Sequence, residues 1–195
     1  MGKDKVYCTQ FVDNYQHWQN LTAEDLSSFS VYAGHAPFQE KDMGRDVFPI
    51  SMIRHPLHRT FSLYFYCLKY PNQFLHSYAL DHSIEEFYDA ASAAKPAYFH
   101  DLCCRRICGK PDFDLARETI ESKFLAVGRT EEFESFLSRV LQFMGFESTS
   151  ASHPREITGK YRELESKSEL SRRILDNNSN DLELYNYMEK SYFGT

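Results

Sequence analysis

The chain has 195 residues, of which 42% are hydrophobic and 15% aromatic, which is enough to build one domain with a real core. Its formal net charge of −6 at pH 7 argues against general nucleic-acid binding, which needs a basic surface. A polyanionic partner would also need basic residues that are clustered locally. Two such clusters occur in the sequence: Arg105, Arg106 and Lys110, and then Arg155, Lys160, Arg162, Arg172 and Arg173.

Short apolar stretches predict β-strands at residues 6–9, 31–33, 47–53 and 124–127. Pro49 is unusual inside the third of these, because proline suits only the start or the edge of a strand. Strands that alternate with helices predict a parallel α/β sheet.

Helices are predicted at 56–70, at 83–96 behind a capping box of Ser83 and Glu86, in a segment that ends at Gly145, and at 181–193. The segment 99–117 carries cysteines and arginines and is expected to be an irregular surface excursion, and 148–161 is polar and expected to be mobile. The inward face of the last helix should be Leu182, Tyr185, Met188 and Tyr192.

The helix at 56–70 begins with Pro56, which suits a first turn. Arg59, Ser62 and Tyr66 share one of its faces, so Ser62 should be free to meet a ligand. The opposite face is expected to be the core stripe, made by Leu57, Phe61, Tyr64, Phe65 and Leu68.

The sequence contains five cysteines: Cys8, Cys67, Cys103, Cys104 and Cys108. Cys67 lies among aromatic residues and is expected in the core. The last three are close enough for a small disulfide loop or for a metal site. The metal interpretation is the weaker one, because there is no Cys-x-x-Cys pair and the nearest histidine, His100, is alone.

Two glycosylation sequons, Asn20-Leu21-Thr22 and Asn177-Asn178-Ser179, are compatible with a secretory route. The sequence has no signal peptide and no transmembrane stretch. Any membrane anchor is therefore expected to lie outside this chain.

The most informative stretch is RHPLHRTFSLYFY at 54–66. It places Arg54 at the carboxyl end of a predicted strand, where open α/β sheets bind ligands. A guanidinium can grip a phosphate with two N–H donors, and the hydroxyl of Ser62 can add another donor. The plainer alternative is a strand–turn–helix in which a solvated Arg54 caps the sheet.

Five segments in order resemble sulfotransferases that use the donor PAPS, 3′-phosphoadenosine 5′-phosphosulfate. The resemblance is closest to the Golgi heparan sulfate and uronyl 2-O-sulfotransferases. The second segment is similar to that family's 3′-phosphate element, Arg-x-Pro-x-x-Arg-x-x-Ser-x-Tyr after a strand. The segments are YAGHAPF at 32–38, PISMIRHPLHRTFSLYFY at 49–66, FLAVGRTEEFESFLSRVLQFMGF at 124–146, HPREITGKYR at 153–162 and DLELYNYMEKSYF at 181–193.

The resemblance implies an α/β fold with a P-loop NTPase-like parallel sheet flanked by helices. One such domain would span 1–195 and would be incomplete at its N-terminus. It implies that Arg54 and Ser62 hold the 3′-phosphate of PAPS. Arg59 either supports that site or is surface charge.

His35 would be the general base that takes the proton from an acceptor hydroxyl, since an imidazole near its neutral pKa can accept it. Arg155, Lys160 and Arg162 are candidates to contact the donor or an acidic sugar. The residues by themselves also allow an ordinary loop histidine and a solvated basic loop.

The implied reaction is in-line transfer of the sulfuryl group to a glycan hydroxyl, in a uronic acid of a glycosaminoglycan, without a metal. The implied location is the lumenal side of the Golgi membrane. The family also has a phosphate loop similar to Pro-Lys-x-Gly-x-[Ser/Thr]-[Ser/Thr], whose backbone and lysine hold the 5′-phosphosulfate. This sequence contains no such motif.

Two hypotheses follow: a fragment of an active enzyme, or a catalytically inactive relative that binds glycans or a protein. Under both, these 195 residues alone are expected to transfer sulfate poorly or not at all. A nucleotide kinase is a third alternative, but the sequence offers neither its phosphate loop nor its magnesium-binding carboxylates.

Overall fold

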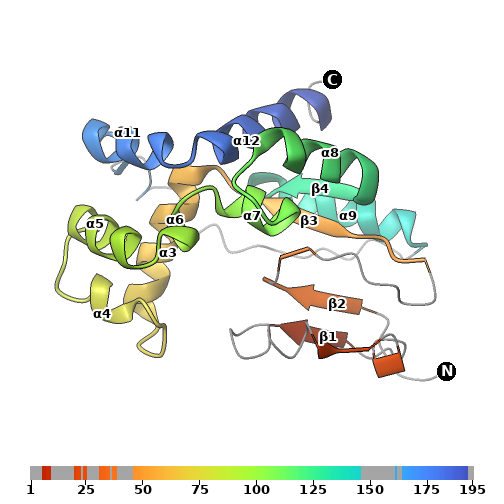
Figure 1. The fold of residues 1–195 in the computed structure, drawn as a ribbon, viewed down its shortest axis with the longest axis horizontal. Coiled ribbons are helices and arrows are strands. Elements are labelled where there is room, and N and C mark those ends of the chain that lie inside the picture. Colours follow the sequence, from red (N-terminus) through yellow and green to blue (C-terminus); the bar gives the residue numbers. More distant parts are fainter. Residues whose placement is uncertain are drawn as a thin grey trace.

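The computed structural model describes residues 6–9, 20–22, 24–25, 31–35, 37–38, 46–145, 161 and 164–192. It is a mixed α/β structure in which helices predominate (Figure 1). The helical elements are α3 (Pro56–Lys69), α4 (His76–Ala79), α5 (Ile84–Ala94), α6 (Pro96–Phe99), α7 (Leu102–Cys108), α8 (Phe113–Lys123), η1 (Thr130–Glu132), α9 (Phe133–Phe143), α11 (Ser168–Asp176) and α12 (Ser179–Tyr192).

Within the described residues the strands form two parallel pairs. β1 (Val6–Thr9) pairs with β2 (Val31–Gly34), and β3 (Ile50–Ile53) pairs with β4 (Ala126–Arg129). The predictions of strands and of parallel pairing are confirmed, although each described sheet has two strands. Pairing of β3 with β4 sets the carboxyl ends of both strands at one rim.

The third strand is shorter than predicted. Pro49 precedes β3 instead of lying within it, and its carbonyl accepts a hydrogen bond from the backbone of Leu125 at 2.8 Å. Proline therefore marks the start of the strand, as its missing N–H requires. Pro56 begins α3 as predicted, and the reciprocal bonds between Ser83 and Glu86 confirm the capping box of α5.

The prediction of an irregular segment at 99–117 is wrong, because most of it lies in α6, α7 and α8. Gly109, with φ of 80°, ends α7, and the carboxylate of Asp112 accepts the backbone N–H of Leu115 to open α8. The buried residues are one helical repeat apart: Cys104 with Ile107, and Ala116 with Ile120.

The predicted core faces were partly wrong. On α3, Leu57 and Phe61 are buried, but Leu68 is exposed and Thr60 is fully buried. On α12 the fully buried leucine is Leu184, whereas Leu182 is half-buried. The short polar helix α11 was not predicted.

The core has two parts, and α3 belongs to the first of them. One joins α3, α5, α6 and α11, and the other joins β3, β4, α7, α8 and α12. Helices cover both faces of the β3–β4 pair: Val127 packs in the second core, while the next residue, Gly128, faces Phe136 of α9. In Figure 1, α12 runs beside α7 and α8 above these strands.

The small disulfide loop considered within 103–108 is not formed, because Cys103, Cys104 and Cys108 are free thiols. The Cys108 thiol instead donates to the carbonyl of Cys104, one turn earlier, at 3.2 Å. Burial raises the pKa of Cys103 to about 12 and that of core Cys67 to about 11. No group of three metal-ligand side chains occurs in the described part of the chain, and no described helix is long and apolar enough to cross a bilayer.

Candidate functional site at the carboxyl ends of β3 and β4

The candidate site lies where β3 and β4 end. Ile53 is paired with Arg129, so the residues that follow, Arg54 and Thr130, leave the sheet at the same rim. Ligands of open parallel sheets bind at such a rim. Charged and aromatic side chains meet at this rim. They come from α3, from the turn after β4, from Tyr161 and from α12.

Arg54 is half-buried at this rim. Its Nη2 donates to the hydroxyl of Tyr161 at 3.4 Å, and its guanidinium lies 5.7 Å from the centre of the Tyr161 ring. Its Nε is buried and has no hydrogen-bond partner among the described residues. Arg54 is therefore a partly satisfied cation that can still form hydrogen bonds.

The N-terminus of α3 lies directly beside Arg54. His55 occupies the N-cap position, but no side chain bonds the N–H groups of the first turn. Uncapped N–H groups and the helix dipole favour an anion at this position. Arg54 and the 14-residue helix α3 thus present positive potential from adjacent places.

Ser62 lies two turns into α3, half-buried, and its hydroxyl has no hydrogen-bond partner among the described residues. At about 100° per residue, it lies within roughly 20° of His55 around the helix and about 10 Å along the axis. No hydrogen bond joins Ser62 to Arg54 in the described structure. One phosphate can contact both residues only if the Arg54 side chain extends along α3.

Contacts of Tyr161 indicate that Arg54 does extend in that direction. The ring of Tyr161 is 5.3 Å from that of His58 and stacks on it at 19°, and it is 6.5 Å from the ring of Phe65. Both of these residues neighbour Ser62 on α3. The guanidinium of Arg54 reaches this same tyrosine, so it lies along the helix surface that leads to Ser62.

Two histidines at the start of α3, His55 at the N-cap and His58 in the first turn, have pKa values shifted in opposite directions. His58 bonds Glu131 through Nδ1 at 3.3 Å and Glu165 through Nε2 at 2.7 Å, and these carboxylates, Glu131 first, raise the pKa of His58. His55, with its ring 5.3 Å from that of His58, has a lowered pKa because of burial and then because of the neighbouring charge. Of the two, His58 is the one whose protonated form is favoured. Its carboxylates contact opposite ring nitrogens, so the three groups cannot surround one metal ion.

Arg129 ends β4, and both of its terminal nitrogens, Nη1 and Nη2, are in ion pairs. It pairs with Glu132 and, at 2.6 Å, with Glu189 of α12, and it lies over the ring of Tyr185. These carboxylates raise the pKa of Arg129 in spite of its desolvation. Arg129 and the His58 carboxylates were not predicted as site residues. For Arg129 and Glu131 the signal in the sequence was position alone, at the end of a strand and in the turn after it, and Glu165 had no local signal.

His35, the predicted general base, follows β2 and is exposed. Desolvation, and then the positive charge of Arg106, lower its pKa, so it is neutral at pH 7. The backbone N–H of Phe38 donates to the carbonyl of Arg106 at 2.6 Å, which ties this segment to α7. No hydrogen bond or ion pair among the described residues links His35 to Arg54 or Ser62.

The other predicted binding residues, Arg155, Lys160 and Arg162, lie outside the described residues. Arg59 is neither surface charge nor part of the rim. It donates to the carbonyls of Tyr98 and Phe99, at 2.8 and 3.1 Å, and to the side chain of Asn178 at 2.9 Å. Arg59 therefore fixes α3 to α6 and to the start of α12.

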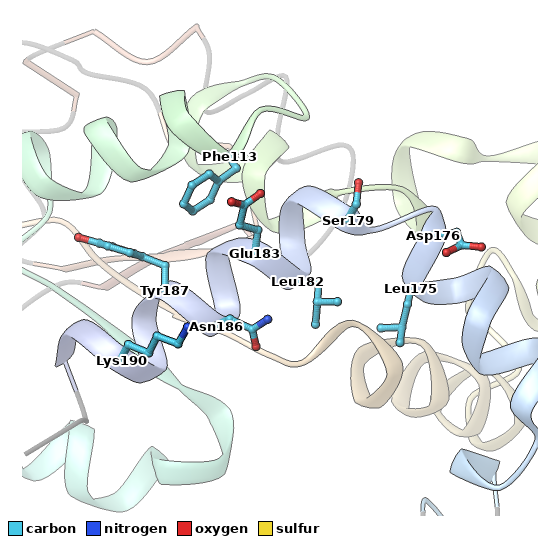
Figure 2. Close-up of a pocket in the computed structure, with 9 residues that line it drawn as sticks. All are labelled: Phe113, Leu175, Asp176, Ser179, Leu182, Glu183, Asn186, Tyr187 and Lys190. Carbon is cyan, nitrogen blue, oxygen red and sulfur yellow. The ribbon is translucent and has the colours of Figure 1, made fainter.

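A separate groove of about 520 Å³ runs along α12, on the side of α8 and α11. Figure 2 shows the side chains of Phe113, Glu183 and Tyr187 gathered at one part of it, with Asn186 and Lys190 further along α12. None of the predicted site residues lines this groove.

Comparisons with models of known families, with curated proteins and with solved structures found no match to this chain. The functional proposal therefore depends on the chemistry of the rim and on the sequence motifs.

Proposed function

We propose that the chain is a PAPS-dependent carbohydrate sulfotransferase with the P-loop NTPase-like sulfotransferase fold. Its acceptor would be a hydroxyl of a glycan, in a uronic acid of a glycosaminoglycan such as heparan sulfate, and its place the Golgi lumen. The observation that carries the proposal is Arg54 at the carboxyl end of β3, directly before the uncapped N-terminus of α3.

In this proposal the 3′-phosphate of the nucleotide lies against Arg54 and extends towards Ser62. A dianionic phosphate can accept N–H donors from the guanidinium Nε and Nη2, and the hydroxyl of Ser62 supplies another donor. The α3 dipole adds positive potential to the site. Arg54 can provide these bonds because its Nε has no described partner and Nη2 makes one long bond to Tyr161.

His35 would act as the base. Its lowered pKa keeps the imidazole neutral at pH 7, so it can accept a proton from the sugar hydroxyl as that oxygen bonds to sulfur. The bond from sulfur to the bridging oxygen breaks, and the nucleotide leaves with that electron pair. The sequence has no lysine in a phosphate loop to offset the charge on the leaving group, so we expect this chain to bind the nucleotide but to transfer sulfate slowly.

A second candidate is a related domain that binds glycans or a protein without catalysis. Two observations favour it: the sequence lacks the lysine-bearing phosphate loop, and Arg54 is already bonded to the buried Tyr161. This candidate predicts no affinity for the nucleotide.

Calorimetry with 3′-phosphoadenosine 5′-phosphate tests the proposal. Arg54→Ala should weaken binding by about 10- to 100-fold, because a hydrogen bond to a charged group contributes roughly 1.5–3 kcal/mol. Ser62→Ala should weaken it by about 3- to 10-fold, as expected for the loss of one hydroxyl donor.

Two controls make the measurement specific. Arg172→Ala removes an exposed arginine of α11, paired with Glu169, and should leave the affinity unchanged. Adenosine 5′-monophosphate lacks the 3′-phosphate, so Arg54→Ala should not alter its affinity. The proposal is wrong if the wild-type chain does not bind the nucleotide, or if Arg54→Ala binds it as tightly as the wild type.

A further inference from the structure

A short strap lies on the surface of α3 and covers Arg54. We define the strap as the described residues Tyr161 and 164–167. Tyr161 is only 6% exposed and lies against Phe61, whose ring is 5.9 Å away, as well as against His58 and Phe65. Its hydroxyl accepts the hydrogen bond from Arg54. The side of Arg54 that faces α3 is thereby covered by an aromatic ring.

Two charged contacts, together with the packing of Tyr161 and Leu164 in the core of α3, α5 and α11, hold the strap to the rest of the chain. Glu165 bonds Nε2 of His58 at 2.7 Å, and Lys167 forms an ion pair with Glu85 of α5. Within the strap, the backbone N–H of Lys167 donates to the carbonyl of Leu164 at 3.1 Å. The hydroxyl of Ser171 in α11 donates to the carbonyl of Glu165 at 3.4 Å. The hydrogen bond from Lys167 lowers the pKa of Glu85 below its ordinary value, whereas the His58 contact depends on one proton.

The geometry at His58 makes this dependence strong. A protonated imidazole donates from both nitrogens, one to Glu131 after β4 and one to Glu165 of the strap. A neutral imidazole has one N–H, so one of the two carboxylates must then face a ring lone pair. The two carboxylates would no longer have a cation between them.

The other charged groups around His58 fit this arrangement. The positive charge of Arg54, at the end of β3, helps to lower the pKa of Glu131. The ring of His55 is 5.3 Å from that of His58, but its pKa is lowered, so His55 does not replace the charge that His58 loses. The carboxylate of Glu189 in α12 favours the protonated form of His55, but it already forms an ion pair with Arg129. The two carboxylates raise the pKa of His58 above its ordinary value of 6.5.

We propose that His58 is a pH-sensitive latch, which holds the strap over Arg54 when it is protonated and releases the strap when it loses the proton. Release frees Tyr161 and Glu165 while Lys167 stays attached to α5 and acts as the hinge. The guanidinium of Arg54 is then open to an anionic ligand. Only the identity of that ligand, a nucleotide 3′-phosphate, rests on the proposed function.

Amide hydrogen exchange on the ligand-free chain tests the latch. Peptides covering the strap should lose protection by roughly 10-fold or more between about pH 6 and pH 8.5, after correction for the intrinsic exchange rate. Peptides from α5 and α8 should keep their protection. Equal strap protection at both pH values would overturn the proposal.

Variants identify the titrating group. His58→Gln and Glu165→Gln should each give low strap protection at both pH values, and thermal unfolding establishes that each variant is folded. If His58→Gln does not fold, Glu165→Gln keeps the test decisive, because Glu165 is exposed enough for an isosteric change. His82→Gln, at an exposed histidine outside the rim, should retain the wild-type pH dependence. Retained pH dependence in a folded Glu165→Gln variant would also overturn the latch.

The latch and the nucleotide proposal fail separately. If strap protection responds to pH as expected but the chain does not bind 3′-phosphoadenosine 5′-phosphate, the latch stands and the sulfotransferase proposal fails. If the nucleotide binds in an Arg54-dependent way while strap protection ignores pH, the latch alone is wrong.

Discussion

Asp101 and Asp181 cap each other's helices. The carboxylate of Asp181, in the first turn of α12, accepts the backbone N–H groups of Cys103 and Cys104 at 2.9 and 2.8 Å, at the start of α7. The carboxylate of Asp101, just before α7, accepts the backbone N–H of Asp181 at 3.0 Å. Both aspartates are buried, so each helix start depends on the other helix for its hydrogen bonds.

Replacement of Asp181 should therefore destabilise the fold. Asp181→Ala removes the cap of α7 and leaves two backbone N–H groups without an acceptor. We expect a loss of about 2–4 kcal/mol in the free energy of unfolding, from a cap contribution of roughly 0.5–2 kcal/mol plus the cost of unpaired buried donors. Urea denaturation measures this loss.

An aspartate that does not cap across helices provides the control. Asp114→Ala removes an exposed carboxylate on α8 that pairs with Arg117, three residues later. We expect a change below about 0.5 kcal/mol, as for other surface pairs. A loss at Asp181 no larger than the loss at Asp114 would contradict the cross-capping account.

Gly128 of β4 is required by the ring of Phe136. A Cβ added at Gly128 would lie 2.4 Å from Cγ of that ring, far inside van der Waals contact. Gly128→Ala should destabilise the chain by about 1–3 kcal/mol through overpacking. Because the cause is a clash with one ring, Phe136→Leu should cost less in the Gly128→Ala background than in the wild type, as a double-mutant cycle of unfolding free energies would measure.

A control glycine separates the clash from backbone strain. Gly109 has φ of 80° and open space around its Cα, so Gly109→Ala should cost only the left-handed conformation, roughly 1–2 kcal/mol. That cost should be independent of Phe136. Equal coupling of both glycines to Phe136 would show that contact with the ring is not the reason for Gly128.

Much of the local structure follows from sequence rules, because its determinants are local. Ser83 with Glu86, and Pro56 after a strand, define helix starts through bonds within three residues, and both predictions are confirmed. The segment 99–117 was wrongly predicted to be irregular. Its cysteines and arginines obscure the helical spacing of the buried residues Cys104, Ile107 and Ala116. The cap of α7 is Asp181, which is 77–78 residues away in the sequence. A local sequence pattern cannot predict a cap at that separation.

The candidate site likewise has features that the sequence predicts and features that it does not. The motif predicted that Arg54 follows a strand and that Ser62 lies off the core, and the structure has both arrangements. The cover of Arg54 by Tyr161 joins residues 107 positions apart and depends on packing against α3. The same separation hides the bond between His58 and Glu165 from any local pattern.

The stability of the chain should depend on pH through His58. Its folded-state pKa lies above the unfolded value of 6.5, so its contribution is fully present below pH 6.5 and is lost as pH rises through the folded pKa. Glu131 has the opposite pH dependence. Burial opposes its charge, but the hydrogen bond from His58 lowers its pKa below 4.5. Its contribution to stability is therefore lost only as pH falls through that lowered pKa. The pair should stabilise the fold fully between about pH 4.5 and 6.5.

The measurement is the difference in unfolding free energy between the wild type and His58→Gln across pH. We expect the difference to be largest in this window and to shrink above it. Because His58 and Glu165 are both partly exposed, the difference should also shrink with added salt. A difference that grows above pH 6.5 would contradict the assignment of His58 as the charged histidine.

The free thiols should be nearly inert in the folded chain. Burial raises the pKa of Cys67 to about 11 and that of Cys103 to about 12, and it also raises the pKa of Cys104. The reactive thiolate is then scarce at neutral pH.

Alkylation by iodoacetamide, followed residue by residue with mass spectrometry, should be at least about 10-fold slower at these three positions in buffer than in denaturing urea. Cys108 is less buried than Cys104 and should react faster than it does. Fast alkylation of folded Cys103, or a mass that shows a Cys103–Cys108 or Cys104–Cys108 disulfide in the folded chain, would contradict the packing of α7 against α12 and β3.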